Sequence, residues 1–145
     1  MKLGIGVDHH GVELKQKLTE YLTKEGYNVV DYGTNSFDMV DYCDYAFKVG
    51  EAVVKKEVDF GILLCNTGIG MSIAANKVKG VRCAHVSNVY EAHMTRRDND
   101  ANVIALSSRI EFNQLCEILK EFLNSEYLNE ERYNRRINKI NTYGE

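Results

Sequence analysis

Short apolar runs alternate with amphipathic stretches along almost the whole chain of 145 residues. The expected strands cover residues 3–7, 28–31, 60–64, 81–85 and 103–106, and the expected helices cover 12–24, 42–55, 70–78, 89–96, 111–123 and 129–141. Gly26 follows the first helical pattern at the place where a C-terminal cap belongs. Strand–helix alternation of this kind favours a parallel sheet covered on both faces. We therefore expect an α/β fold, a three-layer domain with a parallel five-stranded sheet and a C-terminal helix.

The bulk properties fit one domain spanning residues 1–145. A net charge of −3 gives no reason to expect a nucleic-acid partner. No apolar run approaches the roughly 18 residues that a membrane span needs, and no signal peptide is evident, so we expect a cytoplasmic protein with no membrane partner. The four cysteines form no C-x-x-C pair, which predicts reduced thiols and no metal site.

In parallel sheets, ligands bind beyond the carboxyl ends of the strands, near the point where the strand order reverses. Cys65 ends an apolar run there and is followed by Asn66, Thr67, Gly68, Ile69 and Gly70. Such a loop, opening a helix, offers backbone N–H groups to a developing negative charge and favours a thiolate. The glycines lack the full dinucleotide fingerprint, so we interpret the loop as an oxyanion or hydroxyl cradle. Alternatively, Cys65 is a small core residue, as we expect for Cys43, Cys83 and Cys116.

Charged residues near the other strand ends and in the tail complete the candidate set. Asp8 and His9 end the first expected strand, where they form a site with Cys65 or, alternatively, serve as a helix cap and a surface residue. Arg109 follows the fifth strand, and Arg132 and Arg136 share one face of the C-terminal helix. These arginines are either a solvated basic surface or a guanidinium cluster that grips a phosphate monoester.

Several motifs in combination resemble the type B ribose-5-phosphate isomerase family, which includes galactose-6-phosphate and allose-6-phosphate isomerases. The resemblance spans about residues 2–140. It rests on Asp8-His9, on Asp41-Tyr42-x-Asp44-Tyr45-Ala46, on Cys65-x-Thr67-Gly68-Ile69-Gly70-x-Ser72-Ile73-Ala74-Ala75-Asn76-Lys77, and on Asn99-Asp100-Ala101-Asn102-Val103.

The resemblance implies a Rossmann-like fold, a homodimer or tetramer with shared active sites, and interconversion of aldose and ketose phosphates without metal or cofactor in the pentose phosphate pathway. Cys65 would be the base that moves a proton between C2 and C1 through a cis-enediolate, with Thr67 and the 66–70 backbone assisting. Asp8, Tyr42 and Asn99 would contact the sugar, and His9, Arg109, Arg132 and Arg136 the phosphate. The tail arginines would reach the neighbouring subunit's site.

Three positions depart from the family pattern. Asp98 stands where most type B enzymes carry a histidine that helps to open the sugar ring. An ordinary aspartate is ionised at neutral pH, so it suits a base better than an acid. Either Asp98 acts with another acid such as His85, or the enzyme uses open-chain sugar, or the substrate differs. Asn66 replaces the usual glycine beside the base, and Tyr133 replaces a usual histidine in the tail.

The leading hypothesis is therefore an isomerase of ribose 5-phosphate and ribulose 5-phosphate. A six-carbon phosphosugar isomerase is the first alternative, although both tail arginines are retained, which favours the ribose assignment. A catalytically silent phosphosugar-binding protein is the second alternative, and a redox role for Cys65 is a weaker third.

Overall fold

All five strands of the protein pair in parallel in one sheet, in the order β2-β1-β3-β5-β4. The computed structural model describes residues 1–145. Its strands are β1 (Lys2–Val7), β2 (Asn28–Asp31), β3 (Phe60–Cys65), β4 (Cys83–His85) and β5 (Val103–Ser107). Its helices are the 3₁₀ turn η1 (His9–Gly11), α1 (Val12–Lys24), α2 (Tyr42–Val54), α3 (Ile69–Ala75), α4 (Val89–Asn99), α5 (Phe112–Asn124) and α6 (Glu131–Thr142).

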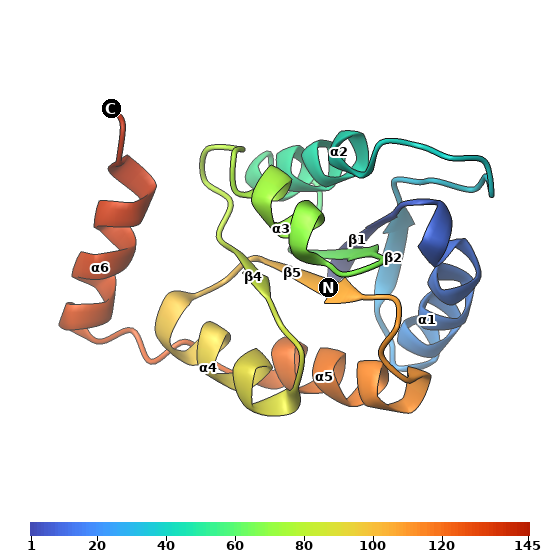
Figure 1. The fold of residues 1–145 in the computed structure, drawn as a ribbon. Coiled ribbons are helices and arrows are strands. Elements are labelled where there is room, and N and C mark those ends of the chain that lie inside the picture. Colours follow the sequence, from blue (N-terminus) through green and yellow to red (C-terminus); the bar gives the residue numbers. More distant parts are fainter.

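Helices cover both faces of the sheet, so the domain has the expected three layers (Figure 1). α1, α4 and α5 enclose one apolar core with alternate strand residues such as Leu64, and α2 and α3 enclose the other with Leu63 and Cys65. Because successive strand side chains point to opposite faces, burial on both sides explains why the strands are continuous apolar runs. The predicted fold class is confirmed.

The C-terminal helix α6 stands apart from these layers at the edge of the molecule (Figure 1). It meets the body mainly along α4, and Tyr133 is its buried residue. The preceding segment is tied to α4 by the Leu128 N–H, which donates to the carbonyl of Arg97 at 3.1 Å. No helix of the protein is both long and apolar enough to cross a membrane.

Element boundaries differ from the expected ones mainly around β4 and α4. β4 begins at Cys83 rather than at residue 81, because the Val81 N–H closes a turn onto the Val78 carbonyl. α4 continues past Arg96 to Asn99 and is capped by Asp100 in the left-handed conformation, at a φ of 47°. Asp98 and Asn99 therefore belong to the last turn of a helix. Gly26 has a φ of 95°, as expected after the end of α1.

Candidate active site

The strand order reverses between β1 and β3, which lie side by side in the middle of the sheet. Asp8 follows β1 and Cys65 ends β3, so both reach the carboxyl edge at that point. The Asp8 N–H donates to the Leu64 carbonyl at 3.2 Å, which fixes the two strand ends against each other. A crevice at such a reversal is the usual ligand site of open α/β sheets.

The Cys65 sulfur is enclosed by the loop that follows it. Only 5% of the residue is exposed, and the Gly68 N–H donates to Sγ at 3.1 Å. A donor aimed at sulfur suits a thiolate. Gly68 has a φ of 82°, and a Cβ there would lie 2.8 Å from the Leu106 backbone, so only glycine fits this turn. The loop backbone is thus shaped around the sulfur.

The end of β5 holds the other side of this loop. Ser107 Oγ donates to the Asn66 carbonyl at 2.7 Å, and the Ser108 N–H donates to the Cys65 carbonyl at 2.9 Å. The side chains of Asn66, Thr67 and Ile69 remain exposed. Thr67 Oγ1 accepts the Ile69 N–H at 3.2 Å. Two adjacent strand ends therefore fix the backbone while the loop's polar side chains face outward, free to meet a ligand.

Tyr42 is brought to the same loop by the start of α2. Its ring lies on Gly70, where a Cβ would come within 2.6 Å of the ring and 3.0 Å of the hydroxyl oxygen. Gly70 is therefore required by this close approach. Tyr42 is 43% exposed, so one side of the ring remains available.

His85 and Arg109 complete this edge from β4 and β5. His85 Nε2 donates to the Thr67 carbonyl at 2.9 Å, which leaves Nδ1 as its free ring nitrogen. The Arg109 N–H donates to Ser107 Oγ at 3.1 Å, and its side chain is exposed. The histidine proposed from the sequence as an alternative acid does contact the Cys65 loop.

Asp8 is buried and binds its neighbour His10. It accepts the His10 N–H at 3.0 Å and pairs with His10 Nδ1 at 3.1 Å, so it caps η1 as the alternative assignment predicted. His9 Nδ1 accepts the Val40 N–H at 3.3 Å. Donor atoms of Asp8, His9 and His10 lie within 4.8 Å of one another, close enough for a metal ion, but the hydrogen bonds above already engage them.

The remaining candidates, Asp98, Asn99, Arg132 and Arg136, lie at the opposite, amino edge of the sheet or beside it. β5 starts at Val103 beside Gly61 and ends at Ser107 beside Cys65. These five residues span about 13 Å at the usual rise of a strand. Asn99 and Asp98 precede the start of β5, and α6 packs on α4. One chain therefore does not bring these residues to Cys65.

Arg82 connects two helices at the amino edge. Its guanidinium donates to the carbonyl of Asn99 at 3.2 Å, to the carbonyl of Asp100 at 2.8 Å and to Oδ1 of Asn141 at 3.2 Å. It thereby joins the end of α4 to α6. Asp98 Oδ1 is enclosed without a hydrogen-bond partner, and its nearest cation is Arg97 Nε at 3.6 Å.

The two tail arginines gather around one ring. The guanidinium of Arg132 lies 4.8 Å from the centre of Tyr133 and that of Arg136 lies 6.0 Å from it. Arg132 Nη2 also donates to the Tyr133 hydroxyl at 3.0 Å. Since Tyr133 is buried while both arginines are exposed, the ring holds a pair of cations at the surface.

Two of the other cysteines, Cys83 and Cys116, have thiols whose pKa is raised by burial. Burial raises the pKa of the Cys83 thiol to about 12, and a hydrogen bond with Ser72 lowers it to a smaller extent. Burial likewise raises the pKa of Cys116. All four cysteines are free. Cys83 is thus a neutral thiol at physiological pH, as expected for a structural residue.

Reasoning from the sequence missed Arg82, Lys15 and Ser107. The signal for Lys15 is its position within the apolar face of α1, where it is 2% exposed between Val12 and Leu18. Arg82 and Ser107 carry no comparable signal, because their roles depend on backbone groups from distant segments.

A cavity of about 690 Å³ lies at the amino edge between the α3–β4 turn, α4 and α6. Asn99 and Arg82 line it, but no residue of the Cys65 loop does.

Comparison with known proteins identifies the family of the chain. Residues 3–140 match the ribose/galactose isomerase family. Ribose-5-phosphate isomerase B of Escherichia coli is 42% identical, over 87% of this chain and 85% of its own. Subunit LacB of the galactose-6-phosphate isomerase of Clostridium acetobutylicum is 41% identical, over 88% and 74%. The structure of ribose-5-phosphate isomerase B from Mycoplasma genitalium with bound ribulose-5-phosphate superposes with a TM-score of 0.93 at 42% identity, over 98% and 95%.

The fold and these relatives show that the protein is an isomerase. The chain belongs to the ribose/galactose isomerase family, and its relatives are sugar phosphate isomerases.

Proposed function

We propose that the protein interconverts ribose 5-phosphate and ribulose 5-phosphate, with Cys65 as the base. The observation that carries this proposal is the Cys65 sulfur at the strand-order reversal, enclosed by a loop whose Gly68 N–H points at it. Thiolates and backbone N–H groups are suited respectively to taking a proton from carbon and to stabilising the oxyanion that results.

In the proposed reaction the Cys65 thiolate takes the proton from C2 of the open-chain aldose. The C–H electron pair forms a C1–C2 double bond, and the carbonyl oxygen at C1 becomes the enediolate oxygen. Backbone N–H groups of the 66–70 loop and the Thr67 side chain stabilise that charge. The thiol then returns that proton to C1, while the proton of the C2 hydroxyl passes to the enediolate oxygen on C1, so that C2 becomes the ketone carbon and C1 carries a hydroxyl group. Atoms and charge balance without a co-reactant.

We further propose that the active site is completed by a second copy of the chain. Asp98, Asn99 and the tail arginines lie at the amino edge, which is separated from Cys65 by the length of β5, about 13 Å. A homodimer that apposes the carboxyl edge of one copy to the amino edge of the other brings the two sets together. The phosphate then lies against His9 and Arg109 of one copy and Arg132 and Arg136 of the other. Pairing of such dimers into tetramers is compatible with this arrangement.

Ring opening needs a base for the anomeric hydroxyl and an acid for the ring oxygen. We assign the base to Asp98, whose Oδ1 lacks a hydrogen-bond partner. His85 is the candidate acid, because it contacts the Cys65 loop through the Thr67 carbonyl. In the dimer proposed here the two groups come from different copies.

A six-carbon phosphosugar is the second candidate substrate. The relative LacB, a galactose-6-phosphate isomerase subunit, is almost as similar to this chain as the Escherichia coli ribose enzyme. Asn66, which stands beside the base with an exposed side chain, is a residue that distinguishes substrate length. The proposed chemistry at Cys65 is the same for both sugars.

The test is incubation of the purified protein in D₂O with ribose 5-phosphate, allose 6-phosphate and galactose 6-phosphate in separate samples. Proton NMR follows ketose formation and deuterium incorporation. We expect turnover of ribose 5-phosphate to exceed that of both six-carbon sugars. Turnover confined to a six-carbon sugar would replace the proposed substrate while retaining the chemistry. Binding without exchange at carbon for any of the three would contradict the proposed activity of the homomer.

A further inference from the structure

Lys15 is a buried cation whose side chain binds the segment that follows β2. Although it lies on α1, its Nζ donates to the Thr34 carbonyl at 2.6 Å and to Asn35 Oδ1 at 2.5 Å, and pairs with Asp31 at 2.9 Å. An ammonium that is 2% exposed requires compensating partners of this kind. All of these partners lie in residues 31–35, where the chain leaves β2.

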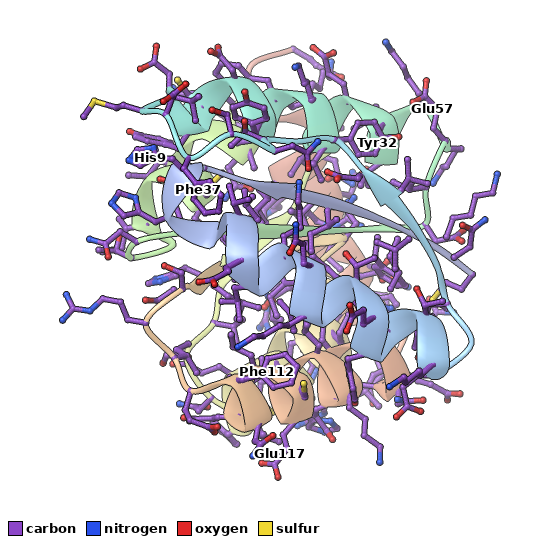
Figure 2. The ribbon with its side chains drawn as sticks, turned by 90° about the vertical axis from the view of Figure 1, so that its right-hand side faces the viewer. His9, Tyr32, Phe37, Glu57, Phe112 and Glu117 are labelled. Atoms are coloured by element: carbon purple, nitrogen blue, oxygen red, sulfur yellow. The ribbon has the colours of Figure 1, made fainter.

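The same segment begins the loop of residues 32–41, which reaches the candidate site at its other end. The Val40 N–H donates to His9 Nδ1 there. Backbone bonds to Val7 hold residues 33 and 34, but the tip has little packing, since Phe37 is 73% exposed and Met39 is 86% exposed. Figure 2 shows His9 and Phe37 at the same end of the molecule. The loop therefore depends on polar anchors at its two ends.

The Val40 contact has a chemical consequence for His9. A backbone N–H can donate only to a ring nitrogen with a free lone pair, so Nδ1 carries no proton and the neutral ring carries its proton on Nε2. The neighbouring carboxylate, Asp8, is engaged by His10, whose ring centroid lies 4.2 Å from that of His9. No carboxylate therefore competes with Val40 for Nδ1.

We infer that Lys15 is a positioning residue for the isomerase: by anchoring residues 31–35 it holds the loop whose Val40 N–H fixes His9 as the Nε2–H tautomer. His9 then presents a neutral N–H donor to the substrate phosphate. The last step rests on the proposed function, in which His9 contacts that phosphate. The tautomer and its dependence on Lys15 do not.

The first experiment needs no substrate. Nitrogen-15 NMR of the full-length protein, with the signal assigned by comparison with His9→Gln, reads the His9 tautomer directly. We expect Nε2–H in the wild type and an average of both tautomers in Lys15→Met, whereas Lys17→Met, an exposed change on the same helix, leaves the signal unchanged. A proton on Nδ1 in the wild type, or an unchanged signal in Lys15→Met, overturns the inference. Asn35→Ala, which removes one partner of Lys15, is the milder variant if Lys15→Met does not fold.

The second experiment is a double-mutant cycle with the substrate that the protein turns over. Lys15→Met is expected to raise KM about tenfold and to lower kcat less than threefold, and to have no further effect in a His9→Gln background, because it acts through His9. Additive effects would show a merely structural role and overturn the inference. If none of the three sugars is turned over, the proposed function fails, while the NMR result still decides the part that concerns Lys15.

Discussion

The two edges of the sheet carry different kinds of groups. At the carboxyl edge Cys65 and its loop are buried or held by backbone hydrogen bonds, and the sulfur is enclosed. At the amino edge the tail arginines are exposed around Tyr133, and Asp98 has an enclosed oxygen without a hydrogen-bond partner. The first edge has the rigidity that proton transfer from carbon requires. The second has exposed charge that suits the binding of an anion.

This difference explains how one small domain provides both halves of a reaction site. The chemistry lies where the fold is most constrained, at the reversal of strand order. The charge lies on α6, which stands away from the body and is held to it by Tyr133 and Arg82. Under the proposed arrangement, changes at Cys65 and its loop affect kcat, and changes at the tail arginines affect KM.

The largest effect is expected from Cys65→Ser. Loss of the base lowers kcat by at least about a hundredfold and abolishes deuterium exchange at carbon, because a positioned base contributes about that much. Cys43→Ser, a partly buried cysteine on α2, is the matched control and should retain activity. Full activity in Cys65→Ser would contradict the proposal that Cys65 is the base.

Replacing Arg132 and Arg136 together by alanine should raise KM by about a hundredfold with a smaller change in kcat. Hydrogen bonds to charged groups contribute about 1.5–3 kcal/mol, and 1.4 kcal/mol is a factor of ten in affinity. Arg135→Ala is the control, since Arg135 is paired with Glu131 of the same helix at 3.1 Å. Steady-state kinetics separate the two parameters. An unchanged KM in the double variant would mean that the amino edge does not bind substrate.

Gly70→Ala tests the close approach of Tyr42 at the carboxyl edge. The added methyl group would lie 2.6 Å from the ring and displace it, so kcat/KM should fall by about tenfold to a hundredfold. In a Tyr42→Leu background the same substitution should cost less, because the conflict is reduced. Equal losses in both backgrounds would show that Gly70 acts independently of the ring.

The smallest effect concerns the cysteines of the two edges. Cys83 begins β4 at the amino edge, and burial raises its pKa to about 12, so the thiol is protonated at pH 8. Iodoacetamide at pH 8 should therefore leave Cys83 unmodified while it reacts with Cys65, and phosphosugar should protect Cys65. Mass spectrometry of the peptides measures both. Preferential modification of Cys83 would contradict the assignment of Cys65 as the reactive thiol and Cys83 as the unreactive one.

The sequence predicted the carboxyl edge better than the amino edge. Strand–helix alternation and the glycines after Cys65 are local signals, and they predicted that Asp8 and the 65–70 loop lie at the same edge of the sheet, as the structure shows. Tyr42, whose ring lies on Gly70, was named only through the family resemblance. The position of Asn99 and Asp98 depends on where α4 ends, and Arg82, which precedes β4, fixes that end by donating to the Asn99 and Asp100 carbonyls. Such long-range contacts leave no periodic pattern. For the tail arginines, the family resemblance already implied a place in the neighbouring subunit's site, whereas the distance of Asp98 and Asn99 from Cys65 had no local signal.

The most direct test of the two-edge account is complementation between inactive chains. Cys65→Ala and the Arg132→Ala, Arg136→Ala double variant are denatured together, refolded together and assayed. In a mixed dimer one site has both defects and the other has neither, so random pairing should restore about a quarter of the wild-type activity. Activity no greater than the sum of the two variants refolded separately would contradict a site shared between copies.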